Sequence, residues 1–257
     1  MSFLKQLFDL YIKSSLHVGL AVLCLVYVTA FSNNLTTDFG YPLCVFFGTV
    51  VCYNLLKYIE LLFKNRIQFK SLWSIYFVTF FALIGFLFLF LELKSNFQIQ
   101  LVYVGILVLI YPFLRKLAWL KISLVAICVS LVSVHIPYLT VKFLPIEYYI
   151  TFLQRFIFVI IWIIPFEISD SNYDLISLNT IVQKHGIRKT KLFGILLVIP
   201  FLILEYSQVN YNLSCIPIAI SLVLFLHFSS EKRNDYYASF WVESIPIWWL
   251  LLFYIFG

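Results

Sequence analysis

Apolar residues occur in long blocks separated by short polar breaks along the whole chain. Blocks of this kind predict membrane-spanning α-helices, because about 20 apolar residues are needed to cross the hydrocarbon core of a bilayer. The strands of a membrane β-barrel would give shorter segments with alternating apolar and polar positions, and the sequence lacks this alternation. Nine helices are predicted, over residues 15–32, 41–63, 72–92, 98–114, 118–139, 148–169, 190–206, 212–229 and 240–256.

The composition and the absence of internal boundaries favour one all-α transmembrane domain over residues 1–257. Hydrophobic residues make up 63% of the chain and charged residues 12%, and the mean hydropathy is +0.98. A water-soluble domain of this length could not bury so much apolar surface. Residues 16–28 resemble the apolar part of a signal peptide, but the long leader with Asp9 favours an uncleaved first helix.

Basic residues predict the orientation of this polytopic bundle. Lys94 and Lys142 fall on one side of the predicted helices, and Arg155 lies within a helix. The positive-inside rule therefore places the N-terminus in the cytosol and, with nine helices, the C-terminus outside. The net charge of +6 is explained by cytosolic loops and does not indicate a nucleic-acid partner. The other 15 of the 18 Lys and Arg residues fall on the N-terminal side: Lys5, Lys13, Lys57, Lys64, Arg66, Lys70, Arg115, Lys116, Lys121, Lys184, Arg188, Lys189, Lys191, Lys232 and Arg233.

Three acidic residues follow one another at the cytosolic end of the sixth predicted helix. Glu167, Asp170 and Asp174 are spaced i, i+3 and i+7, so they share one helix face. Their charges repel one another and oppose the negative C-terminal end of the helix dipole. One interpretation is a site for a divalent metal such as Mg²⁺, which prefers oxygen ligands. The other is a solvated helix end balanced by nearby basic residues.

Two other helices end in polar residues on the same side of the membrane. The second ends with Asn54, Lys57 and a Lys57–Glu60 pair at i, i+3, and Arg66 follows it. The fourth ends with Tyr111-Pro112-Phe113-Leu114-Arg115-Lys116. Taken singly, such residues are typical of interfacial tyrosines, snorkelling lysines and positive-inside anchors. Glu243, near the start of the last helix, is expected either to reach the same face or to be an exposed helix N-terminus.

The order and spacing of these segments resemble the UbiA-type superfamily of intramembrane prenyltransferases. The second Asp-rich motif of that family matches Asp170-x3-Asp174, followed by Thr180 and Gly186. The element that ends the family's fourth helix matches Tyr111-Pro112 and Arg115-Lys116. The first motif, N-D-x-x-D, keeps only Asn54, because Leu55 and Tyr58 stand at the two Asp positions.

The resemblance implies transfer of a prenyl group from a prenyl diphosphate to a small, aromatic or lipid acceptor at the cytosolic face of the membrane. It implies Mg²⁺ at Asp170 and Asp174 with Glu167 as a third ligand, and a single ion because the first motif is incomplete. Lys57 is expected to act with these acids in catalysis. Residues expected to bind the substrate are Asn54, Arg66, Tyr111, Arg115 and Lys116.

Two alternatives remain open. A catalytically degenerate membrane protein of the same fold would bind a prenyl lipid or support a partner enzyme. A transporter would need an internal repeat or acids near the bilayer midplane, and Arg155 is the strongest midplane candidate. Arg155 is expected to pair with Glu205 or a carbonyl instead. The histidines on apolar helices, His17, His135 and His227, are expected to be satisfied within the bundle rather than to bind metal.

Overall fold

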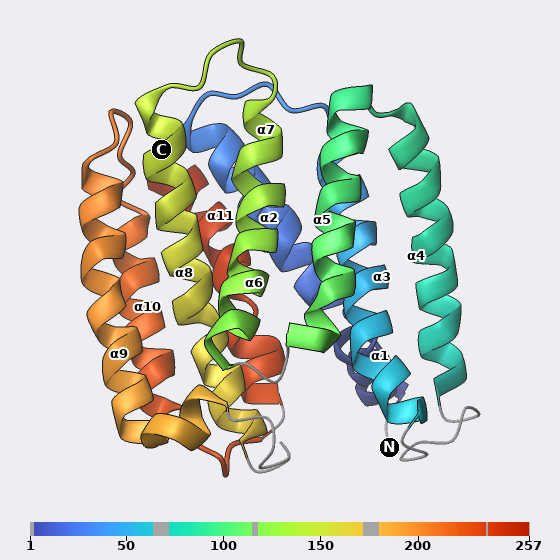
Figure 1. Ribbon diagram of the computed structural model, residues 1–257. Coiled ribbons are helices and arrows are strands. Elements are labelled where there is room, and N and C mark those ends of the chain that lie inside the picture. Colours follow the sequence, from blue (N-terminus) through green and yellow to red (C-terminus); the bar gives the residue numbers. More distant parts are fainter. Residues whose placement is uncertain (1–2, 64–71, 115–117, 172–179, 235, 257) are drawn as a thin grey trace.

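The computed structural model of the chain describes residues 3–63, 72–114, 118–171, 180–234 and 236–256. All regular structure in these ranges is helical (Figure 1). The α-helices are α1 (Phe3–Lys13), α2 (Leu16–Ser32), α3 (Gly40–Phe63), α4 (Trp73–Glu92), α5 (Ser95–Leu114), α6 (Ala118–Ser130), α7 (Ile136–Tyr138), α8 (Ile146–Asp170), α9 (Ile181–Tyr206), α10 (Cys215–Phe228) and α11 (Ile245–Phe256). Two π-helical segments are η2 (Leu131–His135) and η4 (Tyr237–Val242).

Every range predicted from the apolar blocks overlaps a helix or a continuous helical run. Within the described ranges, five of these are long and apolar enough to cross a membrane, and the bent pair of α1 and α2 makes a sixth candidate. Helix α5 buries none of its residues inside the protein, as expected when a helix has lipid as its solvent. These features are consistent with an integral membrane protein. The five are Trp73–Glu92, Ser95–Leu114, Trp119–Tyr138, Ile146–Asp170 and Tyr237–Phe256.

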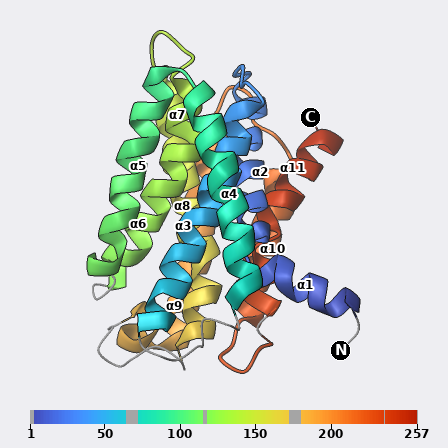
Figure 2. The same cartoon turned by 90° about the vertical axis from the view of Figure 1, so that its right-hand side faces the viewer.

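A short amphipathic helix, α1, precedes the first predicted span. It meets α2 at an angle of 56° and projects from the bundle (Figure 2). The chain turns between them at Ser15, whose φ of 61° lies in the left-handed region. The Tyr58 hydroxyl of α3 donates to the Lys13 carbonyl at 2.6 Å, which satisfies a backbone acceptor at the end of α1. This junction therefore depends on contacts between α1 and α3.

Helix α9 begins at Ile181, nine residues before the predicted start at 190. Thr180 caps it, because its hydroxyl accepts from the Gln183 amide and the Gln183 side chain accepts from the Thr180 amide. The first turn ends at Gly186, whose φ of 76° disfavours residues with a Cβ. The Thr and Gly of the family-like motif thus serve here as a helix cap and a kink.

A π-helical turn interrupts the run from α6 to α7 and contacts α2. A π-turn leaves backbone groups outside the regular helical hydrogen-bond pattern. The carbonyl of Val132 accepts from the Tyr41 hydroxyl of α3 at 2.5 Å. Tyr41 is almost completely buried, so this bond links α3 to η2 inside the protein.

The helices lie roughly along a common axis and give the bundle two distinct ends (Figures 1 and 2). One end, called the α1 end here, holds the N-terminus, the last turns of α3, α5 and α8, and the connection from α10 to η4. The connections α2–α3, α4–α5, α7–α8 and α9–α10 lie at the opposite end. Along the contacts, the helices neighbour one another in the order α4, α3, α2, α11, α10, α9, α8, α6, α5. The ends of α3, α5 and α8 are far apart in the sequence, but they are brought to one end of the fold.

The main apolar core lies between α2 and the helices that follow α5. Phe158, Phe201 and Trp249 pack their rings together at its centre, with centroid distances of 5.0–6.0 Å. Gly194 of α9 lets that helix approach its neighbours, because an added Cβ would lie 2.9 Å from Ile164 and Leu226. This close-packed core fixes the part of α8 that precedes the turn with the acidic residues.

Candidate functional site

The last turn of α8 carries a buried carboxylate at Glu167, which is 3% exposed. Its Oε1 atom lies 2.5 Å from the Nζ atom of Lys121 on α6. Its Oε2 atom is buried without a hydrogen-bond partner in the described part of the chain. A buried carboxylate oxygen without a donor is costly, so this position can accept a cation or another donor.

Asp170 lies one turn beyond Glu167 and is exposed. The two acids therefore differ in access, although they share a face of α8. Asp174, the third member of the predicted acidic face, lies outside the described residues. Over the ranges that are described, no group of three His, Cys, Asp or Glu residues is arranged to hold a metal ion.

Helix α3 presents Tyr53 and Lys57 toward these acids. The two residues are spaced i, i+4, so they lie on one face of the helix. Lys57 is exposed, and its ammonium interacts electrostatically with Asp170 and Glu243. Tyr53 is 40% exposed. Lys57 and Asp170, predicted from the sequence to act together, are therefore close enough for their charges to interact.

Tyr53 is in electrostatic range of residues from three other segments of the bundle. They are Tyr111 of α5, Glu167 and Asp170 of α8, and Glu243 between η4 and α11. We call the set Tyr53, Lys57, Tyr111, Lys121, Glu167, Asp170 and Glu243 the polar cluster. Because Tyr53, Lys57 and Asp170 keep exposed surface, a ligand can reach it.

Glu243 is buried, so it is not the exposed helix N-terminus that was one of its two interpretations. It lies where the π-helical segment η4 gives way to α11. The adjacent Ser244 contacts the Nε2 atom of His17 at 3.0 Å, and the Phe240 carbonyl lies at the same distance from that atom. His17 thus holds the segment that carries Glu243 against the start of α2.

The side chain of Asn54, predicted to contact phosphate, makes its hydrogen bonds within the protein in this structure. Its Nδ2 atom donates to the Ser14 carbonyl and to the Thr79 hydroxyl, both at 2.9 Å. Its Oδ1 atom accepts from the Ser15 hydroxyl at 2.7 Å. A phosphate oxygen needs a donor, and both N–H groups are used within the protein. Asn54 therefore joins the α1–α2 turn to α3 and α4.

The two positions that hold Asp in the family's first motif carry no acid here, and the Lys57 ammonium lies 5.3 Å from the centre of the Tyr58 ring. Leu55 is 46% exposed on the surface of the bundle, and Tyr58 is buried against Leu72 and Ile75. Asn54 and Tyr58 are thus buried, whereas Lys57 at the same end of α3 is exposed. Of the remaining predicted site residues, Arg66, Arg115 and Lys116 lie outside the described part of the chain.

Lys121 and Tyr53 were not predicted as site residues. From the sequence, Lys121 was assigned to the positive charge of a cytosolic loop. The packing of α6 against α8 brings it into an ion pair with Glu167. Tyr53 could have been predicted from the sequence, because it precedes Lys57 by one helical turn and so lies on the same face of α3. Lys121 contributes to the charge of the polar cluster, and Tyr53 contributes to the surface through which a ligand can reach it.

A second group of buried polar residues lies in the opposite half of the bundle. Arg155 is 1% exposed, and its Nη2 atom donates to Thr29 at 3.2 Å. Its guanidinium lies 4.3 Å above the ring of Trp249. Glu205 attracts this charge but makes its hydrogen bonds with Gln154 and with the Asn212 amide. The predicted Arg155–Glu205 pair therefore acts through electrostatic attraction, with no hydrogen bond between the two among the described contacts.

Comparison with protein-family models, with curated proteins and with solved structures gives no match. The proposals below therefore depend on the residues of this chain and on their arrangement.

Proposed function

We propose that this protein is a UbiA-like membrane prenyltransferase, which moves a prenyl group from a prenyl diphosphate to a small, aromatic or lipid acceptor. The observation that carries the proposal is the polar cluster, where Lys57 of α3 lies within electrostatic range of Asp170 of α8 at one end of an apolar bundle. Ionisable residues within a membrane bundle are costly and usually serve a function. An accessible cation beside carboxylates suits a diphosphate that binds together with a metal ion.

The proposed topology has nine membrane spans, with the N-terminus and the α1 end of the bundle in the cytosol. The described connections support it, because those containing Lys94 and Lys142 lie at the end opposite to the N-terminus (Figure 1). Lys5, Lys232 and Arg233 lie at the α1 end. Under the positive-inside rule, the polar cluster then faces the cytosol, where a water-soluble or interfacial diphosphate can enter.

The described residues supply donors that fit Mg²⁺. Glu167 offers the unpartnered Oε2 atom, and Asp170 offers an exposed carboxylate one turn away. Mg²⁺ binds such oxygen donors and usually keeps several water ligands, so two or three protein carboxylates suffice. Asp170, Asp174 and Glu167 would hold the ion. When bound, it would neutralise charge on the diphosphate as the allylic C–O bond breaks.

Other residues of the polar cluster would bind the diphosphate and stabilise the carbocation. The Lys57 ammonium binds diphosphate oxygens and offsets the charge that develops on the leaving group. Tyr53 and Tyr111 present aromatic rings to the same region, where their π faces can stabilise an allylic carbocation. The apolar surroundings keep water from that cation. Glu243, which attracts the Lys57 ammonium, positions it toward the acids of α8.

The proposal predicts Mg²⁺-dependent transfer from geranylgeranyl diphosphate to an aromatic acceptor by purified protein. Mg²⁺-dependent binding of the diphosphate, measured in parallel, tests the site separately from turnover. The variants Asp170→Ala and Asp174→Ala are expected to reduce either signal by at least about 100-fold, since each removes a charged ligand. Glu92→Ala, an acid at the opposite end of the bundle, is the matched control. An affinity for the diphosphate that is unchanged by both α8 substitutions would exclude the proposed site.

Replacement of Lys57 tests the substrate contact separately from the metal. Lys57→Met is expected to weaken diphosphate binding by about 10–100-fold, because a charge-assisted contact is lost. Lys57→Arg keeps the charge and is expected to retain most of the binding. Isothermal titration with the diphosphate, at fixed Mg²⁺, measures both. Equal affinities for the methionine variant and the unmodified protein would contradict this role.

The second candidate function is a non-catalytic protein of the same fold that binds a prenyl lipid. The sequence of α3 favours it, because Leu55 and Tyr58 replace two acids, with Leu55 on the surface and Tyr58 buried against Leu72 and Ile75. The ion pair of Lys121 with Glu167 also competes with metal at that carboxylate. Binding of prenyl diphosphate without turnover, over a broad acceptor panel, would favour this candidate.

A further inference from the structure

Two apolar grooves lie side by side on the surface of the α1 end. The first has a volume of about 400 Å³ and is lined by α1 and the η4 region, with Phe8, Phe240 and Trp241 among its walls. The second, of about 490 Å³, follows α10 along Leu224 and Phe228. Arg233 and Tyr237 line both grooves and form the ridge between them.

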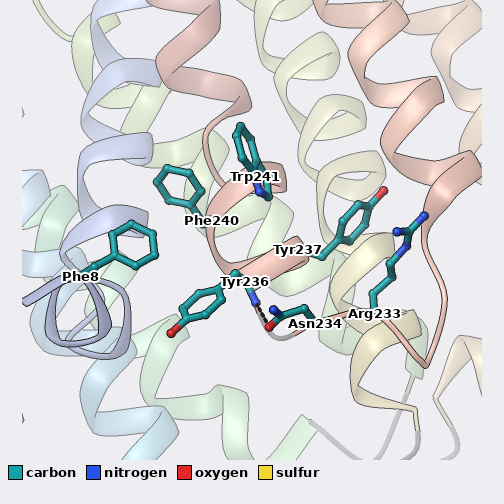
Figure 3. A pocket seen from close by; sticks show the side chains of 7 residues that line it. All are labelled: Phe8, Arg233, Asn234, Tyr236, Tyr237, Phe240 and Trp241. Atoms are coloured by element: carbon teal, nitrogen blue, oxygen red, sulfur yellow. Dashed lines mark hydrogen bonds between the residues drawn. The ribbon is translucent and has the colours of Figure 1, made fainter. Parts of the chain in front are cut away.

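Figure 3 shows the first groove from close by. Phe8 stands on one side, Arg233 and Tyr237 on the other, and Phe240 and Trp241 lie between them. The guanidinium of Arg233 lies 5.3 Å from the centre of the Tyr237 ring. Trp241 and Phe228 are 52% and 51% exposed. An aromatic surface with a cation at its edge is typical of the level where lipid chains meet headgroups.

Arg233 on the ridge and Lys191 of α9, which bind adjacent carbonyls at the end of α10, are two cations whose hydrogen-bonding capacity is only partly used. The Nε atom of Arg233 donates to the Phe228 carbonyl at 3.0 Å, and Nζ of Lys191 donates to the His227 carbonyl at 2.8 Å. These bonds cap the C-terminus of α10, which accounts for the position of both residues. They leave both Nη groups of Arg233 and two protons of Lys191 without a hydrogen-bond acceptor among the described residues.

The charges around the ridge favour an anion. Lys191 and Arg233 repel each other electrostatically, so a negative group between them would be stabilised. Among the described residues that line the two grooves, none is acidic. The nearest described acids are engaged elsewhere, since Asp9 accepts from Tyr236 and Glu231 accepts from Ser171.

We propose that this ridge and its two grooves bind one diacyl phospholipid with an anionic headgroup. The phosphate lies on Arg233 and Lys191, and each acyl chain occupies one groove. Two grooves that share one cationic ridge match a ligand with two apolar chains and one charged head. Helix α1, whose Phe3, Leu4 and Leu7 side chains are exposed, lies beside the first groove and shares the same interface. The site is separate from the polar cluster and does not require prenyl transfer.

Native mass spectrometry of the full chain tests this proposal with an equimolar mixture of dioleoyl phosphatidylglycerol and dioleoyl phosphatidylcholine. The unmodified protein is expected to retain phosphatidylglycerol preferentially. The double variant Lys191→Gln/Arg233→Gln keeps amide donors for the α10 carbonyls but loses both charges. It is expected to lose phosphatidylglycerol retention by about 25-fold, because each basic residue at an anionic surface contributes about fivefold.

The matched control is Lys94→Gln/Lys142→Gln, which removes two cations at the opposite end of the bundle. It is expected to retain the lipid as the unmodified protein does, and the melting temperatures of both double variants confirm that they are folded. Single-chain lysophosphatidylglycerol is expected to bind at least about tenfold more weakly, because one groove stays empty. Equal retention of the two diacyl lipids, equal retention by the two double variants, or equal binding of the lysolipid would overturn the proposal.

Discussion

Replacing Lys121 with methionine is expected to lower the free energy of unfolding by about 3–5 kcal/mol. The substitution removes the ammonium that lies 2.5 Å from Glu167 and leaves a buried carboxylate without a cation. Since Oε2 of Glu167 already has no partner, the variant would leave both oxygens unpaired. Equilibrium unfolding in mixed micelles, followed by tryptophan fluorescence, measures the change.

Two further variants separate the ion pair from a general effect of losing a lysine. Lys121→Met/Glu167→Gln removes both charges and is expected to recover most of the lost stability. Lys184→Met removes an exposed lysine and is expected to change the free energy of unfolding by less than about 0.5 kcal/mol. A stable Lys121→Met protein would show that Glu167 is protonated or otherwise paired. In folded Lys121→Met protein, tighter Mg²⁺ binding would support Glu167 as a metal ligand.

Arg155→Met is expected to destabilise the protein by a similar amount, about 3–5 kcal/mol. Arg155 is one of the largest fully buried side chains, and its guanidinium rests on Trp249 and donates to Thr29. Its removal leaves the buried carboxylate of Glu205 with hydrogen bonds but without the positive charge that attracts it. The same micellar unfolding measurement reports the loss.

The coupling between these two residues is measured with Arg155→Met/Glu205→Gln. If the charges act on each other, the double variant is expected to be more stable than the sum of the single effects by about 1–3 kcal/mol. Lys142→Met, which removes an exposed lysine at the same end of the bundle, is the control. Strict additivity would mean that Arg155 acts through packing on Trp249 alone.

The apolar blocks predicted where the helices lie because lipid imposes a simple requirement on the chain. A segment that crosses a membrane must be apolar along its length and must satisfy its own backbone, so composition alone marks it. The prediction missed two helix ends, one fixed by tertiary contacts and one by a local capping box. The bend at Ser15 depends on Asn54 and Tyr58 of α3, and the early start of α9 depends on the capping box at Thr180.

The candidate site was predicted only in part, because the sequence marks charged positions but not their neighbours. Lys57, Asp170 and Glu167 could be singled out because each is a charge near the end of an apolar helix. Their surroundings could not be predicted, because rotating a helix about its axis by the angle between successive residues changes which neighbour a side chain contacts. Asn54 has the residue type of the family's first motif, yet its hydrogen bonds join the α1–α2 turn to α3 and α4.

The sequence by itself predicted that lipid is the solvent for most of this chain, that its structure is helical, and that its charges gather toward one set of helix ends. These properties follow from composition and from distances along the chain. Only the tertiary structure decided that Lys121 neutralises Glu167, that Tyr53 rather than Asn54 joins Lys57 in the polar cluster, and that Arg233 separates two grooves. Each of these depends on how helices distant in sequence are rotated against one another, which packing determines and local sequence does not.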